Sequence, residues 1–321
     1  MENKPVLKVE NLTKHFSVKG GRKVVHALDD VSFEIPKGKT LGLVGESGCG
    51  KSTCAKTIIR IHEPTSGKVY INDTDISTMR QKELKPYRKH IQMIFQDPYS
   101  SLNSRMTVHD IIAEPLQAHN IASGKTATEM VHDILFRVGL NRDHADRYAH
   151  EFSGGQRQRI GIARALILKP DIVICDEPIS ALDVSIQAQV VNMLKDFQTE
   201  MGLTYLFIAH DLSMVRYVSD VVGVMYLGRL IETCDAAEIY TSPLHPYTQG
   251  LLSSIPIPSP KAAREKISVG IQGDIPSPID LPPGCRFSTR CPKSMPICKE
   301  QEPAMLDAGG SHCVACHLYN K

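Results

Sequence analysis

The feature that most constrains this sequence is a glycine-rich stretch at residues 45–52. It has the sequence Gly-Glu-Ser-Gly-Cys-Gly-Lys-Ser and fits the pattern Gly-x4-Gly-Lys-Ser. The apolar residues 40–44 before it predict a strand, and residues 53–61 after it predict a helix, which is the context of a phosphate-binding loop. The glycines let the backbone curl so that several N–H groups point inward at an anion. The sequence therefore predicts a nucleotide site in an α/β fold.

Two residues of this stretch have distinct expected roles. Lys51 is expected to reach the β- and γ-phosphates, and the Ser52 hydroxyl is expected to ligate Mg²⁺. The N-terminus of the following helix adds its partial positive charge to the site. The other residues expected to contact the nucleotide here are Gly45, Ser47, Gly48, Cys49, Gly50 and Thr53.

A pair of acidic residues follows the apolar run at residues 171–175. An acidic residue at the end of a buried strand places a carboxylate beside a phosphate-binding loop, so Asp176 is expected to hold Mg²⁺, directly or through water. Glu177 comes next, in the position to polarise a water molecule for in-line attack. Together with the loop, this pair predicts nucleotide hydrolysis.

Three further side chains are weaker candidates, because each also has an ordinary structural explanation. Phe16 lies upstream of the loop and is either a platform for adenine stacking or a core aromatic residue. Gln96 ends the apolar run 91–95, where it is either a contact of Mg²⁺ and the attacking water or a solvated loop amide. His210 follows the run 204–208 and either senses the γ-phosphate or holds its loop by hydrogen bonds.

The stretch Ser-Gly-Gly-Gln-Arg at residues 153–157 leads into an apolar-faced helical pattern at residues 160–168. A serine and glycines at a helix start offer a hydroxyl and free N–H groups to an anion. A glycine-rich helix entry is common, so this stretch alone is weak evidence for an anion site.

Strands and helices alternate along the chain, which predicts an α/β core with a largely parallel sheet. Residues 31–35 alternate in polarity and predict a half-buried strand in an N-terminal antiparallel subdomain. Helical spacing over residues 107–140 predicts an inserted helical subdomain, with bounds of about 97–165. We expect a nucleotide-binding domain at residues 1–255, followed at residues 256–321 by a proline-rich connector and a cysteine-rich region.

Composition narrows the classes of function. The 321 residues carry a formal net charge of only +2, so no polyanionic partner such as nucleic acid is indicated. The chain has no apolar run near 18 residues, and its N-terminal residues 1–9 lack the apolar core of a signal peptide. We therefore expect a chain that reaches a membrane through partner proteins.

Five of the nine cysteines lie near the end of the chain, beyond a proline-rich connector. A nucleotide-binding chain without a signal peptide is expected in the cytosol, where disulfides are rare, so this group predicts metal ligands. Grouped thiolates bind zinc as Cys₄ or an iron–sulfur cluster, and the spacing leaves that choice open. The five are Cys285, Cys291, Cys298, Cys313 and Cys316, and the prolines are Pro256, Pro258, Pro260, Pro276, Pro278, Pro282 and Pro283.

Taken in order along the chain, these residues resemble the ATP-binding subunit of an ABC transporter. The resemblance implies ATP as the nucleotide and an ABC ATPase core with a mixed, largely parallel sheet. The matching motifs are the phosphate loop at 45–53, Gln96 of the Q-loop, the signature at 153–156, the Walker B strand at 172–177 with its catalytic glutamate, the D-loop at 180–183 and the switch His210.

The same resemblance implies that the site is completed by a second subunit. Ser153 and Gly155 would contact the γ-phosphate bound by the opposite subunit, so that two nucleotides are sandwiched in a dimer. Nucleotide contacts are also implied for Phe16, Gln156 and Asp183. Phe152 stands where the family more often has leucine, a departure that does not touch the phosphate contacts.

Several stretches are similar to the oligopeptide and dipeptide importer branch of this family. That branch usually has a cysteine at the position of Cys316 and none at that of Cys313. The resemblance therefore implies a [4Fe–4S] cluster, with zinc as the alternative, held by Cys285, Cys291, Cys298 and Cys316. The stretches are residues 45–50, 95–103, 225–228, 245–252 and 284–317.

The branch implies an assembly at the cytoplasmic face of a bacterial inner membrane, with this chain bound peripherally. Its expected partners are a second, paralogous ATPase subunit in a heterodimer, two transmembrane permease subunits and an extracytoplasmic solute-binding protein. The implied function is ATP-driven uptake of oligopeptides or dipeptides. The alternatives are the same motor for nickel or another small solute, and an ABC ATPase acting on nucleic acid, which the short insertion and near-neutral charge disfavour.

Overall fold

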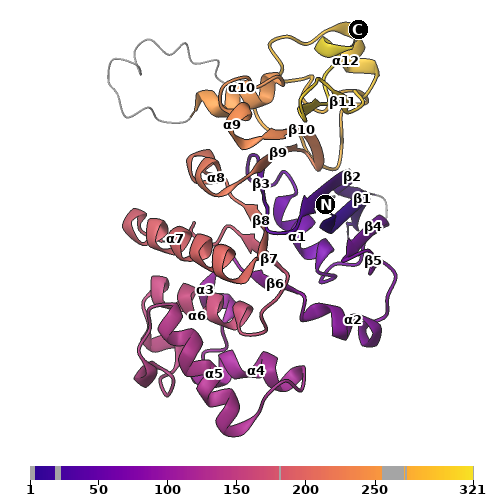
Figure 1. The fold of residues 1–321 in the computed structure, drawn as a ribbon. Coiled ribbons are helices and arrows are strands. Elements are labelled where there is room, and N and C mark those ends of the chain that lie inside the picture. The colour runs from indigo at the N-terminus through magenta and orange to yellow at the C-terminus, as the bar shows by residue number, and fades with distance from the viewer. Residues whose placement is uncertain (1–3, 19–22, 181, 255–270, 272, 321) are drawn as a thin grey trace. The chain divides into compact units, whose positions relative to one another are not determined.

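The computed structural model describes residues 4–320, apart from residues 19–22, 181, 255–270 and 272 (Figure 1). The chain forms two compact units that alternate along the sequence. The first unit comprises residues 1–8, 34–39 and 70–208, and the second comprises residues 9–33, 40–69 and 209–321. Each unit therefore combines stretches that are far apart in the sequence.

In the first unit, three parallel strands end next to candidate catalytic residues. They are β6 (Ile91–Ile94), β7 (Ile172–Asp176) and β8 (Thr204–Ile208), and β7 pairs with both of the others. Every residue of β7 and β8 is buried, which is why their sequences are almost continuously apolar and do not alternate. The carboxyl ends of β6 and β7 lie at the same edge, next to Gln96 and Glu177.

A group of helices lies between β6 and β7 in the sequence, where helical spacing predicted an insertion (magenta in Figure 1). Thr107 caps the helix that begins at Val108, because its hydroxyl accepts a hydrogen bond from the Asp110 N–H. The group comprises α3 (Pro98–Ser101), α4 (Val108–Ala118), α5 (Gly124–Arg137), α6 (Gly154–Leu166) and the 3-10 turns Arg142–His144 and Ala149–Glu151. The unit also contains α2 (Gln81–Arg88) and α7 (Val184–Met201).

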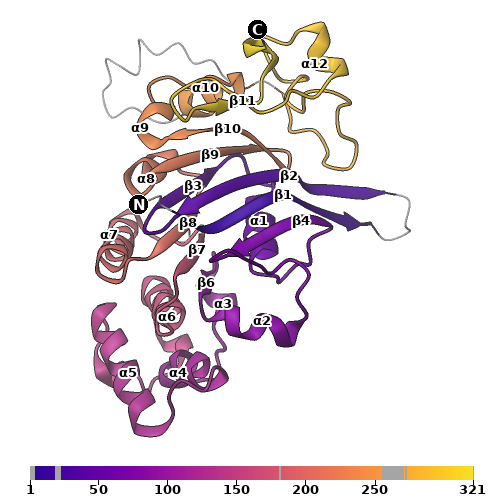
Figure 2. The same cartoon turned by 45° about the vertical axis from the view of Figure 1, so that its right-hand side comes forward.

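The N-terminal sheet has the strand order β2-β1-β4-β5, of which Figure 2 labels β2, β1 and β4. Its strands are β1 (Pro5–Ser17), β2 (Val24–Pro36), β4 (Ser66–Ile71) and β5 (Thr74–Asp75), and β4 and β5 are antiparallel. The start of the sequence predicts a first strand at residues 6–10, and β1 extends well beyond that range. Asn11 has a left-handed backbone (φ 49°), an irregularity that breaks the sequence pattern but does not end the strand.

In the second unit, neighbouring strands follow the order β11-β12-β10-β9-β3, and β3 is the strand before the phosphate-binding loop. β3 (Thr40–Val44) runs parallel to β9 (Val221–Tyr226), and β10 (Arg229–Asp235) runs antiparallel to β9. The next strand, β12, comes from the cysteine-rich end of the chain, which therefore extends the same sheet. The remaining elements are β11 (Leu306–Asp307), β12 (Cys313–Val314), α1 (Lys51–Ile58), α8 (Leu212–Val218), α9 (Ala236–Ile239), α10 (Pro246–Ser253), α12 (Pro296–Glu300) and the 3-10 turn His317–Tyr319.

The proline-rich connector is described in part. Pro256, Pro258 and Pro260 lie outside the described residues. The later prolines lie in a stretch without helix or strand, where the Pro278 carbonyl accepts a hydrogen bond from the His26 N–H (2.9 Å). This contact ties the end of the connector to β2.

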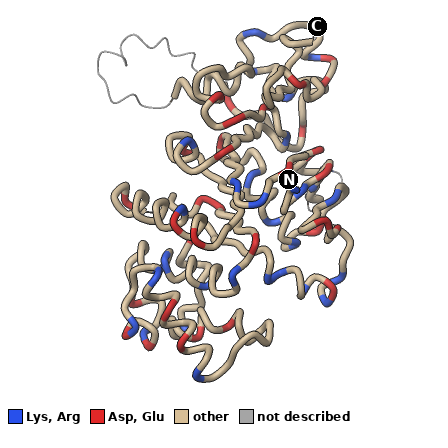
Figure 3. The backbone as a smooth tube through the Cα atoms, in the orientation of Figure 1, with Lys and Arg blue, Asp and Glu red and all other residues tan. Residues whose placement is uncertain are grey.

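Lysine and arginine are interspersed with aspartate and glutamate along the described chain (Figure 3), consistent with a net charge of +2. Within the described residues, no helix combines the length and apolar character needed to cross a bilayer.

Candidate nucleotide-binding site

The phosphate-binding loop connects β3 to α1 in the second unit, as predicted. Three of its glycines have positive φ: 151° at Gly45, 79° at Gly48 and 109° at Gly50. A Cβ atom at Gly50 would lie 2.4 Å from the Ala27 carbonyl oxygen, so glycine is required there for space as well as for conformation. The loop is therefore held close to β2 at the start of α1.

Lys51 and Ser52 form the first turn of α1, where helix N–H groups and the helix dipole favour an anion. The Lys51 ammonium donates hydrogen bonds to the carbonyl oxygens of Gly45 (2.7 Å) and Glu46 (3.0 Å). It lies 3.6 Å from the sulfur of Cys49, a thiol whose pKa is raised by burial. Cys49 is therefore a packed, neutral part of the loop.

Glu46 makes contacts far outside the motif. Its N–H donates to the Tyr247 hydroxyl (2.8 Å), and its carboxylate accepts two hydrogen bonds from Arg290 (2.7 and 3.1 Å). Sequence reasoning missed both partners, because each lies about 200 or more positions away along the chain. The available signal was that Tyr247 and Arg290 both fall in stretches that resemble the importer branch.

Phe16 and His210, the other candidates in the second unit, lie in accessible positions. Phe16 is partly exposed on β1, where its ring meets His62 edge-on at 5.3 Å between centroids. The Lys14 ammonium lies 4.8 Å from the Phe16 ring centroid. Phe16 is thus not a buried core aromatic, and His62 is a neighbour that the sequence did not suggest. His210 is exposed just after β8.

In the first unit, the side-chain amide of Gln96 donates a hydrogen bond to the Glu177 carboxylate (2.7 Å). Asp176 ends β7 and is 2% exposed. Glu177 has a left-handed backbone (φ 45°), which is costly for a residue with a side chain, and its N–H donates to the Ile208 carbonyl (3.0 Å). Strain of this kind persists where the surrounding structure fixes a functional side chain.

The signature residues and Asp183 line one cavity of about 550 Å³ in the first unit. Ser153 caps α6 through its hydroxyl, which accepts from the Gln156 N–H, while the Gln156 side chain accepts from the Ser153 N–H. The helix N-terminus, the Ser153 hydroxyl and Gly155 therefore face a space large enough for part of a nucleotide. Asp183 directly precedes α7 at its N-cap position, and Ala181 of the same loop lies outside the described residues.

Four of the five terminal cysteines lie near one another in the second unit. The Cys285 N–H donates to the Cys298 carbonyl (2.8 Å). Burial raises the pKa of Cys285 to about 11, and the nearby thiols of Cys298, Cys316 and Cys291 act in the same direction. Cys313 instead lies on β12 opposite Thr233 of β10. None of the described cysteines is in a disulfide.

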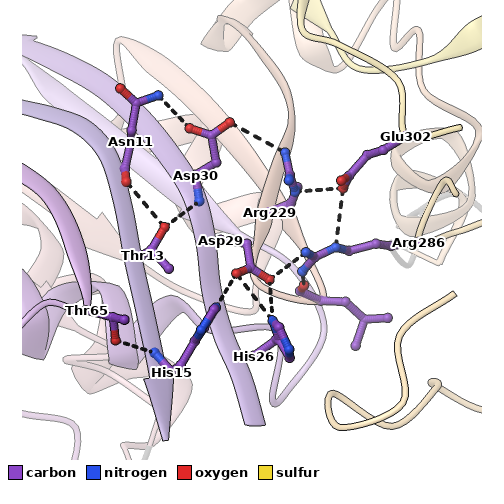
Figure 4. A network of polar contacts seen from close by, with 11 residues as sticks. Asn11, Thr13, His15, His26, Asp29, Asp30, Thr65, Arg229, Arg286 and Glu302 are labelled. Atoms are coloured by element: carbon purple, nitrogen blue, oxygen red, sulfur yellow. Dashed lines mark hydrogen bonds and ion pairs between the residues drawn. The ribbon is translucent and has the colours of Figure 1, made fainter. Parts of the chain in front are cut away.

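A separate polar network surrounds Asp29 of β2 (Figure 4). Its carboxylate accepts hydrogen bonds from His15, from His26 (3.2 Å) and from Arg286 (2.6 Å). Among the described residues, His15, His26 and Asp29 are the one group of three whose metal-binding atoms all lie within 4.8 Å of one another. Burial alone would raise the pKa of Asp29, but its bonds to His15 and Arg286 hold it below its usual range. The Arg286 guanidinium already supplies a cation to this carboxylate.

Comparison with known proteins places this geometry in a family. Residues 28–180 match the family described as ABC transporter, and residues 231–298 match the family described as Oligopeptide/dipeptide transporter, C-terminal region. The dimeric post-hydrolysis state of the ATP-binding cassette MJ0796 bound to ADP and Pi is similar in structure. Its TM-score is 0.66 and its identity 28%, covering 72% of this chain and 98% of that one. The fold and the loop thus define an ATPase of the ABC transporter class.

The similarity to individual known proteins identifies one branch within this class. The chain is 53% identical to the oligopeptide transport ATP-binding protein AppF of Bacillus subtilis, over 98% of each chain. It is 49% identical to the oligopeptide transport ATP-binding protein OppF of Salmonella typhimurium, over 98% of this chain and 96% of that one. The chain belongs to the oligopeptide/dipeptide branch of the ABC transporter ATP-binding family. The resemblance and the ABC ATPase fold predicted from the sequence, with its mixed sheet and N-terminal antiparallel sheet, are both confirmed.

Proposed function

We propose that this chain is the ATP-hydrolysing motor of a peptide importer. The observation that supports this best is the identity of about half, over nearly the whole length, with proteins named as oligopeptide transport ATP-binding proteins. The second family match, to a C-terminal region specific to oligopeptide and dipeptide transporters, supports the same branch. An alternative cargo such as nickel or another small solute is an outcome of the transport test below.

In this proposal the phosphate-binding loop holds the β- and γ-phosphates of ATP. Lys51 supplies the positive charge and the N–H groups of the loop bind the phosphate oxygens. The remaining loop contacts are Gly45, Ser47, Gly48, Cys49, Gly50 and Thr53. Phe16 provides a ring for the adenine, which its partial exposure permits.

Ser52, Gln96 and Asp176 are the proposed ligands of Mg²⁺. Hydroxyl, amide and carboxylate oxygens suit this ion, which would neutralise charge on the phosphates. Glu177 is the proposed general base, because its carboxylate can take a proton from water. Gln96 orients that carboxylate by its 2.7 Å hydrogen bond, and His210 is proposed to contact the γ-phosphate.

The signature cavity is proposed to bind the nucleotide held by a second ATPase subunit. Ser153, Gly155, Gln156 and Asp183 all line it, and they offer hydroxyl, N–H and amide donors to a phosphate. Two composite sites then form when two subunits pair. We propose that the second subunit is a paralogue and that the pair binds two permease subunits at the cytoplasmic face of the inner membrane. A solute-binding protein would deliver the peptide.

We further propose that Cys285, Cys291, Cys298 and Cys316 hold a [4Fe–4S] cluster. The four thiols are neighbours and are not in disulfides, so the donor set fits a thiolate-bound group. The resemblance to the importer branch favours the iron–sulfur cluster, and zinc is the alternative group for the same four thiols. We propose residues 256–321 as the connector and cluster-binding region that follows a nucleotide-binding domain at 1–255.

The experiment is transport by the copurified complex reconstituted in proteoliposomes. ATP-dependent uptake of a labelled oligopeptide is expected, and Lys51→Ala should abolish it. Uptake of radioactive nickel in place of peptide would support the alternative cargo. A complex that takes up neither solute, or that takes up peptide equally well without ATP, would contradict the proposed motor.

A further inference from the structure

An ion pair on the phosphate-binding loop has no role in the function proposed so far. Nη1 and Nη2 of Arg290 lie 2.7 and 3.1 Å from the two carboxylate oxygens of Glu46. The Arg290 side chain is 6% exposed and that of Glu46 is 25% exposed. Two parallel N–H···O bonds fix the orientation of the carboxylate as well as its distance. The loop is therefore held by a residue of the cysteine-rich region.

Arg290 is itself held in place. Its Nε donates to the Gly273 carbonyl (3.1 Å), and its Nη1 lies 3.3 Å from the Tyr226 hydroxyl. Tyr226 packs against Tyr247 at 4.7 Å between ring centroids, and the Tyr247 hydroxyl accepts the hydrogen bond from the Glu46 N–H. The guanidinium of an arginine is always protonated in proteins, so Arg290 brings a permanent positive charge to Glu46. Arg290 therefore fixes the carboxylate of Glu46, and Tyr247 fixes its backbone N–H.

The position of Glu46 makes its charge important for nucleotide binding. A triphosphate bound in the loop brings several negative charges near this carboxylate, and an uncompensated anion there would repel them. The Glu46 carbonyl also accepts a hydrogen bond from Lys51 (3.0 Å), so the orientation of this peptide affects the catalytic lysine. Neutralising and orienting Glu46 should therefore favour binding.

We propose that Arg290 is a positioning residue for ATP binding, which neutralises the Glu46 carboxylate and fixes the second peptide of the phosphate-binding loop. This inference rests on the proposed ATP site at residues 45–53 and adds a contribution from another region of the chain. Arg290 directly precedes Cys291, a proposed cluster ligand. Correct folding of the cysteine-rich region thereby becomes a condition for tight nucleotide binding.

The test compares ATP affinities of the full-length chain by titration with a fluorescent ATP analogue. Arg290→Met leaves Glu46 as an uncompensated anion and should weaken binding about tenfold. Glu46→Gln removes the anion and should stay within about threefold of wild type, because its amide still bonds to Arg290. The double variant should recover most of the loss, since its loop carries no uncompensated charge. The Arg290→Met defect should also shrink at high ionic strength.

Arg229→Met is the matched control, because Arg229 pairs with Glu302 (2.7 Å) and Asp30 (3.6 Å) and makes no described contact with the loop. It should bind ATP like wild type, and thermal unfolding should show that every variant is folded. Each of three results would overturn the inference. Arg290→Met could bind ATP with wild-type affinity, the double variant could bind ATP as weakly as Arg290→Met, or high salt could leave the Arg290→Met defect unchanged. Wild-type affinity in Lys51→Ala would instead overturn the proposed ATP site itself.

Discussion

The side-chain amide of Gln96 donates a 2.7 Å hydrogen bond to the carboxylate of Glu177, and so connects the residues that follow β6 and β7. Glu177 has a left-handed backbone, and this bond holds its side chain at a defined position. A glutamine that moves with its loop would therefore change the position of the proposed general base. The contact therefore couples the position of the loop after β6 to the proposed hydrolysis step at Glu177.

Gln96→Ala should lower ATP turnover about tenfold or more, because Glu177 loses the partner that orients it. ATP affinity should change less than about threefold, since most of the proposed binding contacts remain. Gln92→Ala is the matched control, because Gln92 lies on β6, the strand that precedes Gln96, and its amide donates to the Arg88 carbonyl (2.6 Å). Steady-state turnover and equilibrium titration would separate the two effects. Equal turnover in both variants would rule out an orienting role for Gln96.

Gly50→Ala should be among the most damaging small substitutions in the loop. The added Cβ would lie 2.4 Å from the Ala27 carbonyl oxygen at a residue with φ 109°, so the backbone must shift. We expect a loss of about 3 kcal/mol or more in the free energy of unfolding, together with loss of ATP binding. Gly38→Ala, with φ 73° and open space around its Cβ, should cost about 1 kcal/mol. Urea unfolding compares the two, and equal costs would contradict the steric argument.

Asp29→Asn should destabilise the second unit, because Arg286 loses its charged partner in a mostly buried network (Figure 4). The expected loss is about 2 kcal/mol at neutral pH. The folded-state pKa of Asp29 is held below the ordinary 3.8, so its ionisation contributes stability that is present above that pH. This contribution is lost as the pH falls through the folded-state pKa. Urea unfolding at several pH values should therefore show a gap between wild type and variant that narrows in acid, and a gap independent of pH would contradict this account.

The proposed cluster predicts a difference between two of the terminal cysteines, Cys285 and Cys313. Cys285→Ser should remove iron and sulfide from the purified protein, because Cys285 lies with the other three proposed ligands. Cys313→Ser should keep both, because Cys313 lies on β12 opposite Thr233. Iron and sulfide analysis and the visible absorption spectrum check both variants. Zinc without iron in the wild-type protein would favour the alternative metal, and loss of iron in Cys313→Ser would contradict the proposed ligand set.

Local patterns were sufficient to predict the core elements of this fold. Strands such as β7 and β8 are fully buried and have nearly continuous apolar sequences, and the loop before α1 has a motif with a known backbone shape. The length of β1 was underestimated, because Asn11 has a turn-like conformation inside a continuous strand. Burial and motif spacing therefore carried most of the information about the core.

Contacts between distant parts of the chain could not be predicted from the same patterns. The cysteine-rich end adds β12 to the edge of β10, and no periodicity in a two-residue strand signals this pairing. Arg290 contacts Glu46 although 244 positions separate them, and no local pattern connects the two residues. Such contacts depend on how the chain folds as a whole.

The central claim is that Glu177 drives ATP hydrolysis in an assembled importer. Its most direct test is ATP turnover of the reconstituted complex carrying Glu177→Gln, with the exposed Glu129→Gln on α5 as control. We expect turnover to fall at least about a hundredfold in Glu177→Gln while ATP still binds, and to stay at the wild-type level in the control. Turnover near wild type in Glu177→Gln would contradict the account.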